Sequence, residues 1–135
     1  MRDSFGLVHI AVAVDAFGPG LDAEAAAAAV AAGWYAAAPE ARLTVLAPTE
    51  IGDDVDLVVT GGARFDWQAL RDSLVTVAAG AAVARGVPCV VLAGEVSVGR
   101  REAAAVGVDA AYALADVSRD ALVTLAERVA RRWAR

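Results

Sequence analysis

The sequence predicts an α/β protein with a mostly parallel β-sheet, and three observations support this class. Short runs rich in valine and leucine alternate with longer stretches that have helical spacing. The short runs are apolar throughout, as is typical of strands covered on both faces. Pro39 and Gly86 mark the ends of the first two long stretches. With 135 residues, the chain is long enough for one domain, which we expect to span residues 1–135.

The first strand and the first helix have clear patterns. LVHIAVAV, residues 7–14, is a continuous apolar run and predicts a buried strand. We expect His9 in this strand to be a hydrogen-bonded core residue and not a catalyst. Residues 22–38 are rich in alanine, and Asp22 is suited to cap a helix that begins there. The small side chains suit tight packing of this helix.

The second and third strands are expected at RLTVLA, residues 42–47, and VDLVVT, residues 55–60. A polar turn, residues 48–54, joins them. This connection is too short for an ordinary helical crossover between neighbouring parallel strands. Strand three therefore does not follow strand two in the usual way, or a segment is missing between them.

The second half of the chain continues the alternation. Residues 66–86 have apolar side chains at helical spacing and predict one amphipathic helix. PCVVLA, residues 88–93, predicts the fourth strand, and DAAYAL, residues 109–114, predicts the fifth. We expect a short helix over residues 99–106 between them and a last helix that starts near Ser118.

We expect the strand order 2-1-3-4-5 with helices on both faces, the three-layer arrangement of Rossmann-like and flavodoxin-like domains. The winding then reverses between strands one and three, and ligands in such sheets bind at the carboxyl ends of that pair. Asp15 follows strand one, whereas Arg64 and Asp66 lie in the expected loop after strand three. The sequence therefore predicts that these three side chains converge, with Glu95 close by after strand four.

Each of these residues also has a structural interpretation. Asp66 stands where a helix begins and could cap it, with or without a ligand contact. Arg64 could bind an anion or pair with an aspartate. Asp15 could accept hydrogen bonds from loop amides or take part in chemistry. Gly61 and Gly62 could let the backbone wrap an anion, or could be ordinary turn residues.

The composition excludes several classes of function. All 12 basic residues are arginine, so Schiff-base chemistry and a Walker-type phosphate loop are excluded. The single cysteine, Cys89, lies in an apolar run and is expected to be a buried, inert thiol. The sequence has no His/Cys cluster, so we expect no metal site.

The charge and the hydropathy bound the partners and the compartment. The net charge is −5 and no basic patch is evident, so we expect no nucleic-acid binding. No apolar run is long enough for a membrane span, and we predict no export signal and a cytoplasmic location. Four arginines complement the dipole at the end of the last helix, or else form an anion or acidic-partner site: Arg128, Arg131, Arg132 and Arg135.

Three segments of the chain resemble the type I glycerate kinase family. VAVDAFGPGLDAEAAAAAVAAGW is similar to the family's opening strand and its alanine-rich helix. DLVVTGGARFDWQAL is similar to the family segment Asp-Leu-Val-Ile-Thr-Gly-Glu-Gly-Arg-Leu-Asp, and this match is the most specific of the three. RGVPCVVLAGEV and GVDAAYAL resemble the closing strands. The resemblance covers nearly the whole chain.

This resemblance implies a Rossmann-like domain that a large second domain interrupts, with glycerate and ATP meeting between the two. In this sequence the short turn at residues 48–54 stands where the family carries the second domain. Four polar family positions are also replaced, by Ala16, Gly18, Gly62 and Ser73. The matching polar and loop residues that remain are Asp15, Phe17, Thr60, Gly61, Arg64, Asp66 and Gln68.

We therefore expect a catalytically inactive, single-domain relative of glycerate kinase that needs no cofactor. It would bind a small hydroxy acid, a phosphate or a protein. The expected ligand contacts are Asp15, Thr60, Gly61, Gly62, Arg64, Asp66 and Gln68. The alternative is an active glycerate kinase or other phosphotransferase that uses ATP and Mg²⁺. Asp15 and Asp66 would then be the catalytic residues, and a second copy or a partner would complete the cleft.

A third interpretation is a structural or regulatory subunit. Without the second domain, apolar surface is expected around three aromatic residues, Phe17, Phe65 and Trp67. A homodimer or another protein partner would cover that surface.

Overall fold

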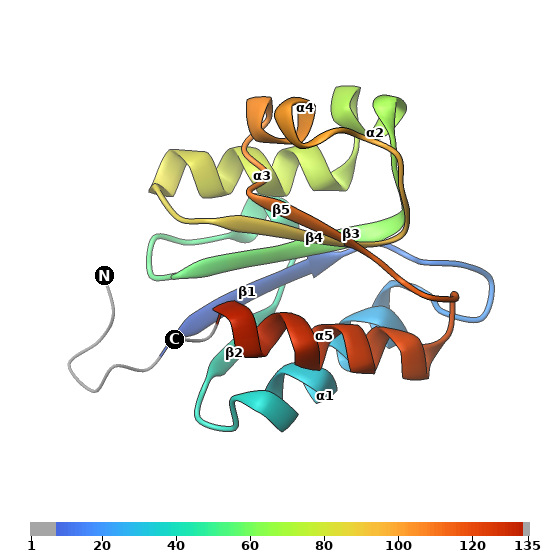
Figure 1. Ribbon diagram of the computed structural model, residues 1–135. Helices are drawn as coiled ribbons and strands as arrows, with labels where there is room; N and C mark the ends of the chain where they lie inside the picture. Colours follow the sequence, from blue (N-terminus) through green and yellow to red (C-terminus); the bar gives the residue numbers. More distant parts are fainter. Residues whose placement is uncertain (1–7, 134–135) are drawn as a thin grey trace.

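In the computed structural model, which describes residues 8–133, the chain folds into three layers around one β-sheet (Figure 1). All neighbouring strands are parallel, and their order is β2-β1-β3-β4-β5. The predicted fold class and strand order are therefore confirmed. The strands are β1 (His9–Val14), β2 (Arg42–Val45), β3 (Leu57–Phe65), β4 (Cys89–Val96) and β5 (Ala110–Ala113). Leu7, the expected start of the first strand, lies outside the described residues.

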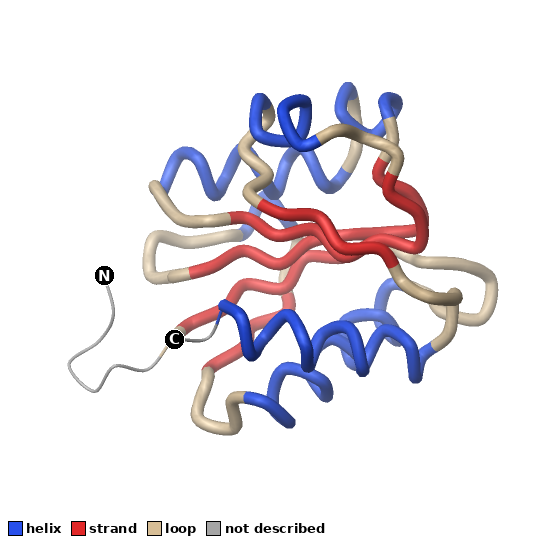
Figure 2. The backbone as a smooth tube through the Cα atoms, viewed as in Figure 1, coloured by secondary structure: helices blue, strands red, loops and turns tan. Residues whose placement is uncertain are grey.

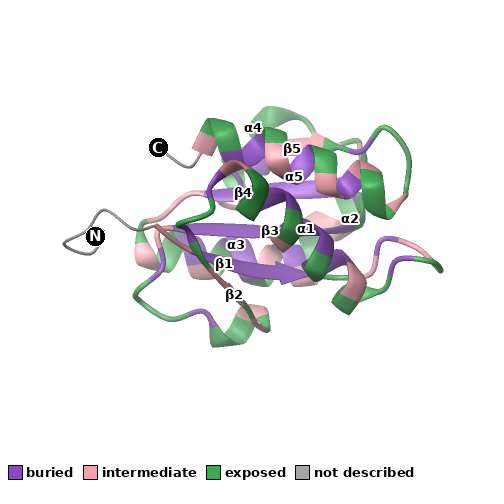
Figure 3. Ribbon diagram, turned by 90° about the horizontal axis from the view of Figure 1, so that it is seen from below, coloured by how far each residue is buried: buried purple, intermediate pink, exposed green. Residues whose placement is uncertain are grey.

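The helices cover both faces of the sheet, as Figures 1 and 3 show. The α-helices are α1 (Ala23–Ala37), α2 (Trp67–Arg71), α3 (Leu74–Arg85), α4 (Arg100–Ala105) and α5 (Arg119–Trp133). Helices α1 and α5 lie together on one face, and α2, α3 and α4 lie on the other. In Figure 3 the inner strands β1, β3 and β4 are largely buried, because parallel strands covered on both faces bury their side chains on each side, whereas the edge strands β2 and β5 are partly exposed.

The alanine-rich sequence of α1 lets this helix pack unusually close to α5. A Cβ atom on Gly33 would lie 2.2 Å from the carbonyl oxygen of Val123 and 2.8 Å from the Cβ of Ala126. Such backbone proximity is open only to residues without bulky side chains at the contact. The next residue, Trp34, is fully buried and fills the core between α1 and the sheet.

The short connection from β2 to β3 passes over the face that carries α3. Strands β2 and β3 are not neighbours, because β1 lies between them and pairs with both. One 3₁₀ turn, η1 (Pro48–Glu50), packs against α3, and the side chains of Ile51 and Val55 are buried beside it. Two apolar side chains thus fill a place that a crossover helix takes in most sheets of this kind.

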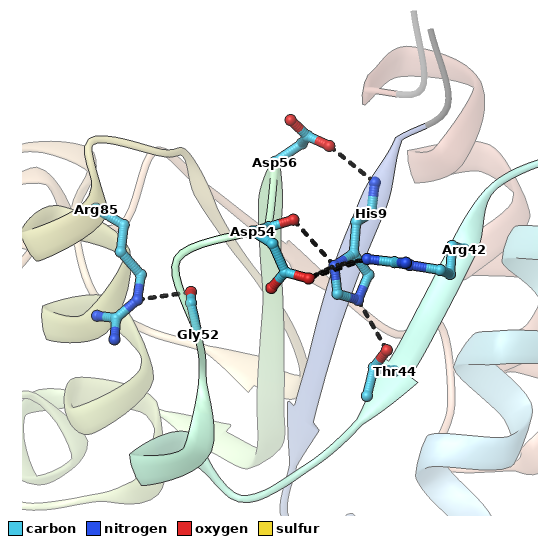
Figure 4. Close-up of polar contacts among 7 residues, drawn as sticks. All are labelled: His9, Arg42, Thr44, Gly52, Asp54, Asp56 and Arg85. Atoms are coloured by element: carbon cyan, nitrogen blue, oxygen red, sulfur yellow. Dashed lines mark hydrogen bonds and ion pairs between the residues drawn. The ribbon is translucent and has the colours of Figure 1, made fainter. Parts of the chain in front are cut away.

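Polar contacts of His9 fasten this connection to the amino-terminal ends of the strands (Figure 4). The imidazole Nε2 of His9 lies 2.7 Å from Thr44 Oγ1, and its Nδ1 lies 3.0 Å from the carbonyl oxygen of Asp54. Arg42 donates to the Asp54 carboxylate at 3.0 Å, and the backbone N–H of His9 donates to Asp56 at 2.9 Å. His9 is therefore hydrogen-bonded within the fold, as predicted.

The expected single helix over residues 66–86 is wrong, because the structure divides it into α2 and α3. Helix α2 ends at Arg71, and Asp72 leaves the helical conformation. Ser73 then caps α3, since its side chain accepts a hydrogen bond from the N–H of Thr76 at 3.3 Å. A serine that can bond to the backbone in this way favours a helix start over a helix interior.

The expectation of exposed aromatic side chains is corrected at two of three positions. Phe17 and Phe65 are 2% and 0% exposed, whereas Trp67 is 61% exposed. Phe65 packs into the core beneath α3, and Phe17 packs into the core beneath α1 and α5. Apolar exposure at this end of the sheet is therefore confined to single side chains such as Trp67.

Candidate functional site

The expected loops after the third and fourth strands are instead a two-stranded ribbon. Pairing between β1 and β3 stops at Val14 and Gly61, but β3 and β4 remain paired through Arg64 and Glu95. Figure 2 shows this ribbon bending towards α2 beyond the rest of the sheet. The prediction that residues 61–66 form a loop is thus wrong up to Phe65. The two glycines suggested a turn, but in the structure they lie within β3 and allow other parts of the chain to pack closely against it.

Gly61 and Gly62 shape the base of the ribbon. A Cβ atom on Gly61 would stand 1.7 Å from the carbonyl oxygen of Leu92 in β4. A Cβ atom on Gly62 would lie 3.4 Å from the Cβ of Asp15, an ordinary van der Waals distance. The backbone N–H of Asp15 donates to the carbonyl oxygen of Gly61 at 2.8 Å. Asp15 is therefore held directly against the ribbon.

Arg64 is paired with Glu95 on the exposed surface of the ribbon. The guanidinium Nε of Arg64 lies 3.6 Å from Glu95 Oε1, and the two side chains are 72% and 70% exposed. The next residue, Phe65, is buried in the core beside α3, so Arg64 leaves the ribbon on the opposite side. Arg64 lies two residues, about 7 Å, beyond Gly62 along the strand.

The carboxylate of Asp15 already has one partner. Its Oδ1 accepts a hydrogen bond from the N–H of Ala16 at 2.8 Å, and the side chain is exposed. A carboxylate has acceptor sites for several hydrogen bonds, so Asp15 can still accept one from a ligand hydroxyl. Asp15 thus offers an acceptor at the base of the ribbon, and Arg64 offers a cation about 7 Å further along it.

Asp66 and Gln68 belong to α2 and not to this group. The Oδ1 of Asp66 accepts a hydrogen bond from the N–H of Ala69 at 3.0 Å and caps the helix. The ribbon carries Asp66 about 13 Å beyond Gly62, at the rise of an extended strand. Gln68 is exposed on α2 and lines an open hollow of about 520 Å³ together with Trp67, Arg71 and Asp72. The cap interpretation of Asp66 is confirmed.

Thr60 is fully buried in β3, beneath the surface that the ribbon forms. Its hydroxyl has no hydrogen-bond partner among residues 8–133. Because its exposed fraction is 0%, a dissolved ligand cannot reach it in this conformation. The structure thus divides the predicted ligand contacts. Asp15 and Arg64 are exposed at the ribbon, whereas Thr60, Gly61 and Gly62 are buried in β3, and Asp66 and Gln68 belong to α2.

Cys89 is buried, as expected. Burial raises the pKa of its thiol from 9.0 to about 12, and the nearby Asp109 carboxylate adds to the shift. The N–H of Cys89 donates to Asp109 Oδ2 at 2.8 Å, so this carboxylate binds the backbone at the start of β4. A thiol with so high a pKa holds almost no thiolate at neutral pH, and the thiolate is the reactive form.

Within residues 8–133, no group of three or more His, Cys, Asp and Glu side chains is arranged to hold a metal ion. In the same range, no helix combines the length and the apolar character that crossing a membrane requires.

Comparison with known protein families shows which family this chain belongs to. The model of the glycerate kinase family matches residues 43–132, which is more than half of the chain. The chain belongs to the glycerate kinase family. The match runs from β2 to α5 and includes the ribbon, Asp66 and Cys89. It confirms the family suggested by the later segments of the sequence, and it begins after the loop that holds Asp15.

Two curated relatives resemble part of this glycerate kinase family chain. Both are uncharacterized proteins, one from Mycobacterium bovis and one from Mycobacterium tuberculosis. Each is 36% identical to this chain over 74 residues, which is 55% of this chain and 19% of the relative. The matched stretch thus spans about a fifth of each relative's length.

Proposed function

We propose that this glycerate kinase family chain is a binding module that takes a small hydroxy acid without transferring phosphate. The observation that supports the proposal is the exposed Arg64–Glu95 pair on the β3–β4 ribbon, whose base carries the exposed carboxylate of Asp15. A hydroxy acid has a carboxylate and a hydroxyl a few ångströms apart. Arg64 and Asp15 are suited to bind these two groups.

The chemistry of the two side chains fits such a ligand. A guanidinium binds a carboxylate through two parallel hydrogen bonds, and such charge-assisted bonds are about twice as strong as neutral ones. Glu95 competes for Arg64, but an ion pair this exposed contributes little stability, so a ligand displaces it at small cost. The carboxylate of Asp15 accepts a hydrogen bond from the ligand hydroxyl.

The charge balance of the chain supports binding over phosphoryl transfer. Phosphoryl transfer depends on cations that hold and neutralise the phosphates. The whole sequence has no lysine, and Arg64 is the single cation among the candidate site residues. Glu95 partly neutralises that cation. A module of this kind would hold a monoanionic carboxylate far better than a triphosphate.

Isothermal titration with D-glycerate, L-lactate, inorganic phosphate and ATP with Mg²⁺ tests the proposal. We expect the hydroxy acids to bind and Arg64→Gln to weaken that binding about tenfold or more, since it removes the charge-assisted pair. Glu95→Gln frees Arg64 and should tighten binding severalfold. Arg101→Gln is the matched control, because Arg101 is exposed on α4 and is not part of the ribbon, and it should change nothing.

Two results would contradict this function. Hydroxy-acid affinity that is equal in Arg64→Gln and Arg101→Gln would remove the ribbon as the binding site. ATP-dependent phosphorylation of glycerate that is lost in Asp66→Asn would favour the active kinase instead. Asparagine can still cap α2, so a loss in that variant would reflect the carboxylate and not the fold. Running the assay at several protein concentrations reveals whether a second copy is needed.

A further inference from the structure

The free edge of β5 is a second feature that the proposed function does not use. Strand β5 ends the sheet and pairs with β4 on one side only. A groove of about 590 Å³ follows β5, and the residues from Asp109 to Tyr112 line it. The groove walls come from the start of α4 and the end of α5, which flank β5 in Figure 1.

The backbone of β5 presents unpaired hydrogen-bonding groups to this groove. The N–H of Asp109 donates to the Cys89 carbonyl oxygen at 2.8 Å, on the β4 side. The N–H of Leu114 also donates to β4, at 2.9 Å from the Ala93 carbonyl oxygen. With Val90 paired to Ala110 and Leu92 to Tyr112, the N–H and C=O groups of Ala110 and Tyr112 face β4, and those of Ala111 and Ala113 point outwards. An edge of this kind is a template for another extended chain. The small side chain of Ala110 leaves room for such a chain to approach.

The groove also offers an apolar surface beside the free edge. The indole Nε1 of Trp133 donates to the hydroxyl of Tyr112 at 3.0 Å, which holds the indole ring next to β5. Val96 and Val98 line the other wall. An added strand could therefore place alternate side chains against Trp133 on one face and against the valines on the other.

Two arginines give the groove a positive charge at both ends. Arg100 is the first residue of α4, which follows the carboxyl end of β4, whereas Arg132 lies in the last turn of α5, near the amino-terminal ends of the strands. Neither forms an ion pair within residues 8–133. The acidic residue of the groove, Asp109, already accepts the bond from the Cys89 N–H. The lining thus has two cations and one carboxylate, which already accepts a backbone hydrogen bond.

We propose that β5 binds an extended segment of another protein as a sixth strand, with an apolar centre flanked by acidic residues. The backbone supplies hydrogen bonds, and the groove walls select the side chains, as in other cases of strand addition. The charges favour such a partner over a second copy of this chain. Antiparallel pairing of two β5 edges would bring the arginines of both copies to one interface, where like charges oppose association.

Nuclear magnetic resonance of the full chain with a capped peptide, Glu-Val-Thr-Val-Glu, tests the proposal. We expect amide shifts at Ala111 and Ala113 and a shift of the Trp133 indole N–H. The same peptide with lysine in place of glutamate should bind about tenfold more weakly or worse, because the end charges reverse. The Arg132→Glu variant should lose the preference for the acidic peptide. Arg128→Glu is the matched control, on the same helix but outside this groove, and should keep it.

Three outcomes would overturn the proposal. One is equal binding of the acidic and the basic peptide. Another is a set of shifts that omits β5. The third is a concentration-dependent dimer that Ala111→Pro dissolves, which would make a second copy the occupant. Proline at residue 111 removes only an outward N–H, and edge strands tolerate it. None of these results depends on hydroxy-acid binding at the ribbon, so the two proposals fail separately.

Discussion

Gly61 and Leu92 approach so closely across β3 and β4 that a Cβ atom on residue 61 would stand 1.7 Å from the Leu92 carbonyl oxygen. No side-chain movement can relieve this contact, because the opposing atom belongs to the backbone. Gly62 differs, since a Cβ atom there would lie 3.4 Å from the Cβ of Asp15. The two adjacent glycines at the base of the candidate site thus differ in whether a side chain can replace the hydrogen.

We predict that Gly61→Ala lowers the free energy of unfolding by about 3 kcal/mol or more, because the two strands must move apart. Gly62→Ala is the control and should change it by less than about 1 kcal/mol. Urea denaturation followed by circular dichroism measures both values. Equal effects of the two substitutions would contradict the close packing of β3 on β4.

The contact between α1 and α5 gives a second prediction. We expect Gly33→Ala to lower the free energy of unfolding by at least about 2 kcal/mol, because the new Cβ meets the Val123 carbonyl oxygen at 2.2 Å. Gly80→Ala, in the exposed interior of α3 with no atom within 4 Å of the new Cβ, should raise it by about 0.5–1 kcal/mol. Thermal unfolding of the two variants should therefore shift in opposite directions.

Thr60 and Thr44 together test how a threonine hydroxyl affects stability when it lacks a hydrogen-bond partner and when it has one. Thr60→Val removes a buried hydroxyl that has no partner within the described residues, so we expect stability to rise by about 1 kcal/mol. Thr44→Val removes the hydroxyl that lies 2.7 Å from His9 Nε2, so we expect a loss of similar size. Denaturant midpoints measure both. A loss of stability in Thr60→Val would show that this hydroxyl has a partner in solution.

The buried thiol of Cys89 predicts a loss of stability at alkaline pH. Burial raises its pKa from 9.0 to about 12 in the folded protein, so above pH 9 the unfolded chain loses a proton that the folded chain keeps. The free energy of unfolding should therefore fall between pH 9 and pH 12, at a limiting slope of about 1.4 kcal/mol per pH unit from this group. The difference between the natural chain and Cys89→Ala, measured against pH, isolates the effect.

The same thiol should resist alkylation by iodoacetamide in the folded protein at pH 8. In 6 M guanidinium, where the chain is unfolded, the thiol should react at the rate of a free cysteine. Rapid modification under native conditions would show that the β4 region opens readily.

Much of the fold follows from local patterns in the sequence. Continuous apolar runs such as residues 10–14 predict strands covered on both faces, and Asp22 and Ser118 stand where α1 and α5 begin. The break at Ser73 had a local signal too, since serine three residues before Thr76 can form a reciprocal cap. The apolar spacing across residues 66–86 concealed that signal, because both helices face the same core.

The candidate site was only partly predictable from the sequence. The positions of its residues depend on the pairing of strands that lie far apart along the chain. The sequence by itself determined the α/β class, the strand order, the helix caps and the chemical identity of the rim residues, since these depend on residue type and on spacing along the chain. Only the tertiary structure decided that β3 and β4 continue as a ribbon through Arg64 and Glu95. Two strands extend together only when their backbones can approach, and that approach rests on Leu92 meeting a residue without a side chain at position 61.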